Sequence, residues 1–149
     1  MEPWKDRVYA TYADTAPNGN QEIAAARERQ LYLRRYRPFL PRDLSAPILD
    51  IGCGAGGFLD ALRSAGYTCA EGVDLSASQV RAAAARGLTG VTHAPADEYL
   101  RARPNRYAAI SAFSVLAHQT RPELLDLLDA LRDALRPGGC LIGVVPNAK

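Results

Sequence analysis

A run of closely spaced glycines restricts the fold of this chain more than any other feature. Gly52, Gly54, Gly56 and Gly57 come directly after residues 47–51, which are apolar except for Asp50. Such a cluster predicts a tight loop between a buried strand and a helix. Glycine adopts backbone angles that other residues avoid, and it lets a ligand approach the main chain closely. The loop is therefore the first candidate for a ligand-binding site.

The rest of the chain alternates between short apolar segments and amphipathic ones. We expect strands over residues 47–51, 68–73, 91–93, 107–113 and 140–145, and helices over 21–37, 58–65, 78–86, 97–103 and 122–135. This alternation predicts βαβ units, and right-handed crossovers favour a doubly wound parallel sheet with helices on both faces. The expected fold class is α/β, with a five-stranded sheet in one domain.

Two of these helices have an apolar side that we expect to face the core. In the first helix it consists of Ile23, Leu31 and Leu33. In the last helix it consists of Leu124, Leu125, Leu128, Leu131 and Leu135, and we expect the Pro-Gly-Gly of residues 137–139 to stop that helix.

Composition excludes several classes of protein. With 149 residues, 48% of them hydrophobic, the chain has the length of one soluble domain, and its net charge of +2 is too small to indicate nucleic-acid binding. Residues 107–117, the longest apolar stretch, are too few to span a bilayer, and residues 1–6 lack a signal-peptide core. Cys53, Cys69 and Cys140 lack metal-ligand spacing. We therefore expect a cytoplasmic protein with reduced thiols and no metal, nucleic-acid or membrane partner.

An acidic residue lies at the distance from the glycines at which a ribose contact is expected. Asp74 ends the second strand, 20 residues after Gly54 (74 − 54 = 20). A carboxylate in that place accepts hydrogen bonds from ribose hydroxyls. The loop and the carboxylate together indicate a ligand that contains a nucleoside.

The loop fits two kinds of nucleoside ligand. Gly52, Gly54 and Gly57 match the G-x-G-x-x-G pattern of dinucleotide-binding loops, whereas Asp50 with Gly52, Gly54 and Gly56 matches D-x-G-x-G-x-G. A dinucleotide would bring its pyrophosphate close to the Asp50 carboxylate, which repels it. S-adenosylmethionine instead brings an ammonium and a sulfonium, so Asp50 favours this cofactor over NAD.

Three segments together resemble class I S-adenosylmethionine-dependent methyltransferases: residues 48–58, 72–76 and 135–139. The tail at 145–148 is similar to that of bacterial sugar and polysaccharide methyltransferases. The resemblance covers residues 46–148, and it implies a Rossmann-like sheet in the strand order 3-2-1-4-5. It further implies a cofactor domain at 46–149 and, at 1–45, an N-terminal arm and helix that form a lid. Tyr9 and Tyr12 of the arm would either close over the cofactor or only dock the arm.

The resemblance also implies roles for individual residues. Asp50, Gly52, Gly54 and Gly56 would line the methionine part of the cofactor, Asp74 would bind the ribose and Leu75 the adenine. Cys53, inside the loop, is also a candidate cofactor-binding residue, whose contribution would be small size and packing rather than chemistry. Relatives carry an acidic residue that accepts a hydrogen bond from the adenine amine, and this chain has Pro95 at that position. Either the Ala96 backbone or Asp97 would then contact the amine, or Asp97 is a solvated helix cap. Phe113 would border the adenine or belong to the core.

The resemblance predicts methyl transfer to a small-molecule or sugar-type acceptor, with S-adenosylhomocysteine as the product. His118 is the candidate general base for a hydroxyl acceptor, or a loop histidine with an ordinary hydrogen bond. Ala117 replaces an acid of relatives, which argues against a metal site. The substitutions at 95, 108 and 117 favour a second hypothesis, a cofactor-binding or scaffold module without turnover. An NAD-dependent oxidoreductase is the third.

Relatives continue after the fifth strand with a helix and two strands that complete a seven-stranded sheet. Here residues 140–145 would form an apolar edge strand, whose unpaired backbone groups invite pairing with another chain. We expect either a homodimer through this strand or a chain shortened from a longer enzyme.

Overall fold

The computed structural model describes residues 21–113 and 115–145; the predicted arm with Tyr9 and Tyr12 lies outside them. The helices are α2 (Gln21–Tyr36), α3 (Gly57–Ser64), α4 (Ala77–Ala85), α5 (Ala96–Arg101) and α6 (Arg121–Ala134), with 3-10 turns η2 (Arg37–Phe39) and η3 (Leu116–His118). The strands are β1 (Ile48–Ile51), β2 (Ala70–Asp74), β3 (Val91–His93), β4 (Tyr107–Phe113) and β5 (Leu135–Val144).

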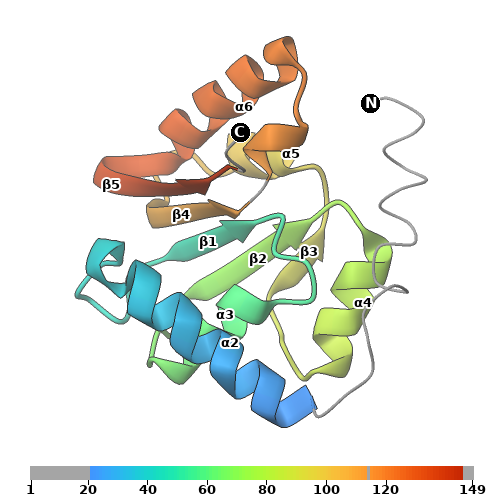
Figure 1. Cartoon of the computed structure of the whole chain (residues 1–149). Helices are drawn as coiled ribbons and strands as arrows, with labels where there is room; N and C mark the ends of the chain where they lie inside the picture. The colour runs from blue at the N-terminus through green and yellow to red at the C-terminus, as the bar shows by residue number, and fades with distance from the viewer. Residues whose placement is uncertain (1–20, 114, 146–149) are drawn as a thin grey trace.

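All five strands form one parallel sheet in the order β3-β2-β1-β4-β5, which confirms the predicted fold class and strand order (Figure 1). The register places Asp50 of β1 between Gly72 of β2 and Ser111 of β4. Because parallel strands end at the same edge, the glycine loop after β1 lies beside the ends of β2 and β4.

Helices cover both faces of the sheet: α2, α3 and α4 lie on one side, and α5 and α6 on the other (Figure 1). Leu49 and Ile51 pack with α5 and α6, whereas Ile48 packs with α2 and α3. Side chains alternate along a strand, so Asp50 points to the same face as Ile48. By the same rule Ser111 of β4 shares that face with Ala109, which packs against α3.

The predicted start of the last strand is wrong by five residues. Helix α6 ends at Ala134, and β5 begins at Leu135 rather than at Cys140. Leu135 pairs with Tyr107 and Cys140 pairs with Ala109, so residues 136–139 form a bulge. Gly138, with φ of +77°, supplies the left-handed backbone of this bulge. The Pro-Gly-Gly segment therefore bends the strand instead of ending the helix.

The buried faces of α2 and α6 also differ from the prediction. Leu31 is 68% exposed, whereas Leu33 contacts the core as predicted, together with Tyr32 and Tyr36. On α6, Leu125 and Leu128 are exposed, and the buried residues are Leu127, Ala130, Leu131 and Ala134. Two alanines bring this helix close to the sheet, and that packing turns part of the leucine stripe toward solvent.

In the part of the chain that the structure describes, no helix is apolar over a length that would cross a membrane. All three cysteines are free thiols. The cytoplasmic location stays a prediction.

Candidate functional site

The glycine loop has a backbone that only glycine adopts readily. Gly52, Gly54 and Gly56 have φ values of +64°, +54° and +81°. A Cβ atom added to Gly52 would lie 2.3 Å from Val115 Cγ2, and one added to Gly56 would lie 2.4 Å from Leu88 Cδ1. These two positions therefore require glycine both for backbone conformation and for space.

Asp74, the last residue of β2, holds the loop through backbone hydrogen bonds. Its Oδ2 atom accepts a hydrogen bond from Gly54 N at 2.8 Å, and its Oδ1 atom accepts one from Ser76 N at 2.8 Å. The next residue, Leu75, is fixed through its carbonyl oxygen, which lies 2.9 Å from His93 Nε2. The end of β2 and the glycine loop thus form one hydrogen-bonded unit.

Asp50 is a buried acid at the centre of the sheet. Its side chain is 2% exposed, and its Oδ1 atom accepts a hydrogen bond of 2.6 Å from Ser111 Oγ. Burial raises the pKa of Asp50 to about 7; the hydrogen bond from Ser111 opposes this shift, and the negative charge of Asp74 adds to it. The site therefore holds a carboxyl group that changes its charge near neutral pH.

An aromatic cluster lies on the same face of the sheet as Asp50. The rings of Tyr32 and Tyr36 from α2 stack on Phe113 with centroid distances of 5.7 and 4.6 Å, and Phe58 of α3 meets Phe113 edge-on at 4.9 Å. Burial raises the pKa of Tyr32, and together with the negative charges of Glu28 and Asp50 it brings this pKa to about 12. Helix α2 thus lies close to the buried acid.

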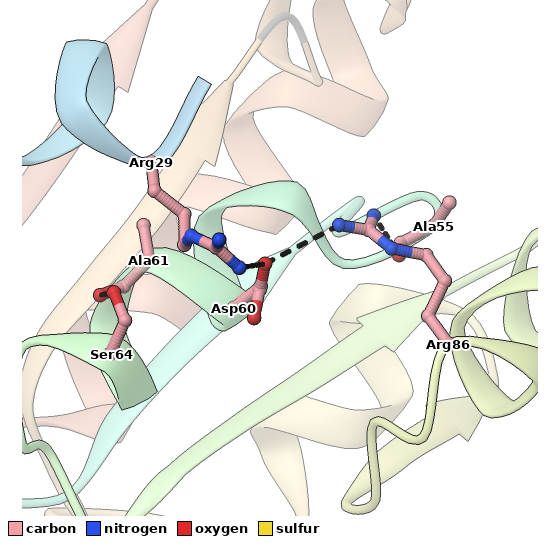
Figure 2. Close-up of polar contacts among 6 residues, drawn as sticks. All are labelled: Arg29, Ala55, Asp60, Ala61, Ser64 and Arg86. Atoms are coloured by element: carbon pink, nitrogen blue, oxygen red, sulfur yellow. Dashed lines mark hydrogen bonds and ion pairs between the residues drawn. The ribbon is translucent and has the colours of Figure 1, made fainter. Parts of the chain in front are cut away.

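Two further carboxylates lie along the start of α3. A Cβ atom added to Gly57, the first residue of α3, would lie 2.9 Å from Glu28 Oε1, so the Glu28 carboxylate of α2 sits against the amino end of this helix. Asp60 lies between two arginines, Arg29 of α2 and Arg86 after α4 (Figure 2). Asp60 is therefore neutralised, whereas no salt bridge among the described residues neutralises Glu28, Asp50 or Asp74.

The chain was compared with known families and structures. A family model described as "Methyltransferase domain" matches residues 25–149. The chain belongs to the methyltransferase domain family. No curated protein matches the sequence significantly.

Solved methyltransferases share the fold of this methyltransferase domain. An S-adenosylmethionine-dependent enzyme from Archaeoglobus fulgidus is 28% identical, with a TM-score of 0.63, and the match covers 79% of this chain and 49% of that chain. A second such enzyme, from Mesorhizobium loti, is 27% identical with a TM-score of 0.63, covering 74% and 50%. A sugar N-methyltransferase from a Streptoalloteichus species is 29% identical with a TM-score of 0.55, covering 80% and 46%. The chain thus spans about half the length of these structures.

Three of the predicted site residues of this methyltransferase domain occupy places set by packing. Cys53 Sγ would lie 2.7 Å from a Cβ atom on Gly72, and burial raises the pKa of its thiol strongly, so the thiol is a packing group. Phe113 belongs to the aromatic cluster, and Ala96 packs against the core between the sheet and α5–α6. The roles predicted for them in cofactor binding stay predictions.

Asp97 and His118 lie on elements outside the glycine loop. Asp97 is a partly exposed residue in the first turn of α5, whose N-cap is Pro95. His118 is exposed on η3, the turn that follows Val115, and Val115 in turn covers Gly52. No hydrogen bond among the described residues joins either side chain to Asp50 or Asp74. In the same residues, no group of three or more His, Cys, Asp or Glu could hold a metal ion.

Sequence analysis missed four residues that shape the site: Ser111, Glu28, Asp60 and Arg86. Ser111 had a usable signal, because it lies beside Asp50 once β4 is placed next to β1, and both side chains then point to one face. Glu28, Asp60 and Arg86 had no such signal in the sequence. Arg86 and Asp60, for example, are 26 residues apart, and only the folded chain brings them together.

Proposed function

We propose that this domain binds S-adenosylmethionine and transfers its methyl group to a small-molecule acceptor, with release of S-adenosylhomocysteine. The observation that carries the proposal is the negative charge around the glycine loop. Glu28, Asp50 and Asp74 surround a loop whose neighbouring acid, Asp60, is already paired. These three carboxylates have no salt bridge among the described residues. Such charges beside a loop favour a ligand with positive charge, and S-adenosylmethionine carries both an ammonium and a sulfonium.

The same charges argue against a dinucleotide. In dinucleotide-binding loops the pyrophosphate lies at the amino end of the helix after the loop, where backbone N–H groups and the helix dipole attract an anion. In this chain the Glu28 carboxylate lies against Gly57 at that end of α3. A pyrophosphate would have to displace a negatively charged side chain, so we disfavour the oxidoreductase hypothesis.

The residues present fit the parts of S-adenosylmethionine. Asp74 would accept hydrogen bonds from the ribose hydroxyls, because each carboxylate oxygen has a second lone pair besides the one that meets a backbone N–H. Asp50, ionised, would attract the ammonium, and Gly52, Gly54 and Gly56 would leave space for the methionine part. Leu75 would pack on the adenine, with the Ala96 backbone or Asp97 near its amine. Cys53 and Phe113 would support the pocket walls.

When bound, the cofactor supplies an activated methyl group whose leaving group is a neutral thioether. The chain therefore needs little acid–base chemistry, and its residues act mainly by holding acceptor and methyl carbon in line and by excluding water. Asp50 and Asp74 would fix the two ends of the cofactor. For a hydroxyl acceptor, His118 would take the proton, since an imidazole is a suitable base near neutral pH.

A sugar-type acceptor is the finer form of this proposal. Its support is the likeness to the sugar N-methyltransferase from Streptoalloteichus, together with the tail at 145–148. Another structural neighbour, 28% identical, is a phosphoethanolamine N-methyltransferase from Haemonchus contortus, which is also named for a small acceptor. Both likenesses favour a small molecule over a macromolecule.

Calorimetric titration with S-adenosylmethionine, S-adenosylhomocysteine and NADH tests the cofactor. We expect S-adenosylmethionine and S-adenosylhomocysteine to bind with micromolar dissociation constants, and NADH not to bind. A dissociation constant of 1 μM corresponds to a binding free energy of about −8 kcal/mol. Neutral methylthioadenosine is the matched probe for charge, because it keeps the nucleoside and lacks the amino-acid part. NADH binding tighter than that of S-adenosylmethionine would overturn the assignment.

The second candidate is a cofactor-binding module without turnover. The observation that favours it is the set of substitutions at 95, 108 and 117, where relatives carry other residues. Incubation with labelled S-adenosylmethionine and a panel of amino sugars and hydroxylated sugars separates the two. Label transferred to any acceptor supports the enzyme, whereas tight binding with no transfer to the whole panel favours the module.

We also propose that a second copy of the chain pairs with β5. This strand lies at one edge of the sheet that the described residues form. An edge strand presents unpaired N–H and C=O groups to another chain. Sedimentation equilibrium over a range of concentrations should detect a dimer, and a monomer at the highest concentration would overturn this part of the proposal.

A further inference from the structure

Asp60 joins three parts of the molecule that are far apart in the sequence (Figure 2). Its Oδ2 atom accepts a hydrogen bond from Arg29 Nη1 of α2 at 2.9 Å and lies 3.5 Å from Nη2 of Arg86, the residue after α4. Arg86 donates a second hydrogen bond, from Nη1 to the carbonyl oxygen of Ala55, at 2.8 Å. Because Ala55 belongs to the glycine loop, one carboxylate links α2 and the end of α4 to that loop.

The peptide group between Ala55 and Gly56 is held at both of its polar atoms. Arg86 donates to its carbonyl oxygen, and its N–H, which belongs to Gly56, donates to the Cys53 carbonyl at 2.9 Å. On the other side of Ala55, the N–H of Gly54 donates to Asp74. Rotation of this peptide would therefore break the contact with Arg86 and disturb the segment that Asp74 holds.

The bridge contributes more to the position of the loop than to the stability of the fold. The side chains of Arg29, Arg86 and Asp60 are 35%, 34% and 24% exposed, and partly solvated ion pairs add little to the free energy of unfolding. Its loss should leave the protein folded. The loop, in contrast, would lose the only side chain that the described hydrogen bonds place on Ala55.

We propose that Arg86 and Asp60 are positioning residues for the cofactor. Arg86 holds the glycine loop in the conformation that binds the nucleoside, Asp60 orients Arg86, and Arg29 extends the link to α2. No hydrogen bond or ion pair among the described residues joins Arg86 or Asp60 to Asp74, the proposed ribose ligand, so their effect reaches the cofactor through the loop backbone. This inference rests on the proposed function, that is, on cofactor binding at this loop.

Titration of variants with S-adenosylhomocysteine tests the inference. Arg86→Gln and Asp60→Asn should weaken binding by about three- to tenfold, the range expected for the net loss of one ordinary hydrogen bond, with little change in unfolding temperature. Arg86→Lys keeps a charged donor and should restore most of the affinity. Because Asp60 acts through Arg86, the double variant should bind no more weakly than the weaker single variant.

Arg63 provides the matched control. It also donates to backbone carbonyls, those of Ala70 and Thr89, but these lie away from the glycine loop. Arg63→Gln should therefore keep wild-type affinity. If it weakens binding as much as Arg86→Gln, affinity follows general stability and the inference is wrong.

Failure of the inference and failure of the proposed function give different results. If the wild-type protein does not bind S-adenosylhomocysteine, the proposed function is overturned. If the wild type binds at micromolar concentration and folded Arg86→Gln binds equally well, only the inference is overturned. Should Asp60→Asn fail to fold, Arg86→Gln and Arg86→Lys decide alone, since they leave the carboxylate of Asp60 and its contact with Arg29 in place.

Discussion

The two faces of the sheet differ in what they bury. The face toward α5 and α6 buries apolar side chains such as Leu49, Ile110 and Leu131. The face toward α2, α3 and α4 buries Asp50 and Ser111 as well, and its helices hold Glu28 and Asp60 close to the glycine loop. The apolar face stabilises the fold, whereas the other gives up part of its stability to place charge beside the glycine loop.

This comparison predicts that the two faces respond oppositely to substitution. Substitutions that shorten buried apolar side chains on the α5–α6 face should lower the free energy of unfolding and should not change cofactor affinity. Substitutions on the other face should change affinity, and at one position they should raise stability. Active sites that hold charge at a cost in stability are common, because function requires groups that folding alone would not choose.

The largest effect is expected on the apolar face. Leu131→Ala removes a side chain that is 1% exposed, and it should lower the free energy of unfolding by about 3 kcal/mol through lost burial and the remaining cavity. Urea denaturation measures this loss. Leu125→Ala, on the same helix but 57% exposed, is the control and should change stability little. A loss of affinity in folded Leu131→Ala would show that the faces are not independent.

Asp50→Asn should act in the opposite direction on the other face. Folding raises the pKa of Asp50 from 3.8 to about 7. The contribution of Asp50 to the stability of the folded protein is therefore fully present below pH 3.8, and it is lost as pH rises toward and through 7. Asparagine keeps an oxygen for Ser111 without this charge. The ligand-free variant should therefore be more stable by about 2 kcal/mol at pH 8 and show a smaller advantage at pH 5.

The same variant should bind the charged cofactor more weakly. In the wild type, affinity for S-adenosylmethionine should rise between pH 6 and pH 8 as Asp50 ionises. Affinity for neutral methylthioadenosine should stay nearly constant over that range. In Asp50→Asn both profiles should be flat, and a steep profile that persists in the variant would assign the titration to another group.

Asp74→Ala should lower affinity by about tenfold or more, because it removes charge-assisted hydrogen bonds to the ribose. Part of this loss comes from the loop, since Asp74 also accepts hydrogen bonds from Gly54 and Ser76. Asp126→Ala, an exposed acid on α6, is the control. Unchanged affinity in folded Asp74→Ala would move the ribose to another part of the site.

The fold class was predictable from the sequence because it follows from alternation and local signals. Apolar segments, helices of matching length and the glycine cluster were enough to give a parallel α/β sheet and to bring Asp74 to the loop, whereas the strand order came from the resemblance to methyltransferases. The side of each helix that packs was less predictable. On α6 the packing residues include Ala130 and Ala134, and a stripe of leucines does not reveal that small residues meet the sheet.

The electrostatic surroundings of the loop were the least predictable part. The helices that carry Glu28 and Asp60, and the one that Arg86 follows, take relative positions that depend on packing of the whole face. No spacing rule connects these three residues in the sequence. Ser111 differs, because register alone pairs it with Asp50. Residues within one sheet are thus predictable from strand order, whereas contacts between helices require the structure.

The smallest expected effect separates two glycines within the loop itself. Both Gly54 and Gly56 have a left-handed backbone, so alanine costs about 1 kcal/mol or more at either position. A Cβ on Gly54 finds its nearest neighbour at 3.6 Å, whereas one on Gly56 meets Leu88 at 2.4 Å. Gly56→Ala should therefore be less stable than Gly54→Ala by about 1 kcal/mol, the cost of moving a packed leucine.

Gly54→Ala should instead show its loss mainly as weaker cofactor binding, because its free side faces Gln79 and the proposed ligand space. Equal stabilities for the two variants would mean that Leu88 moves without cost, and that backbone conformation alone sets the need for glycine at both positions.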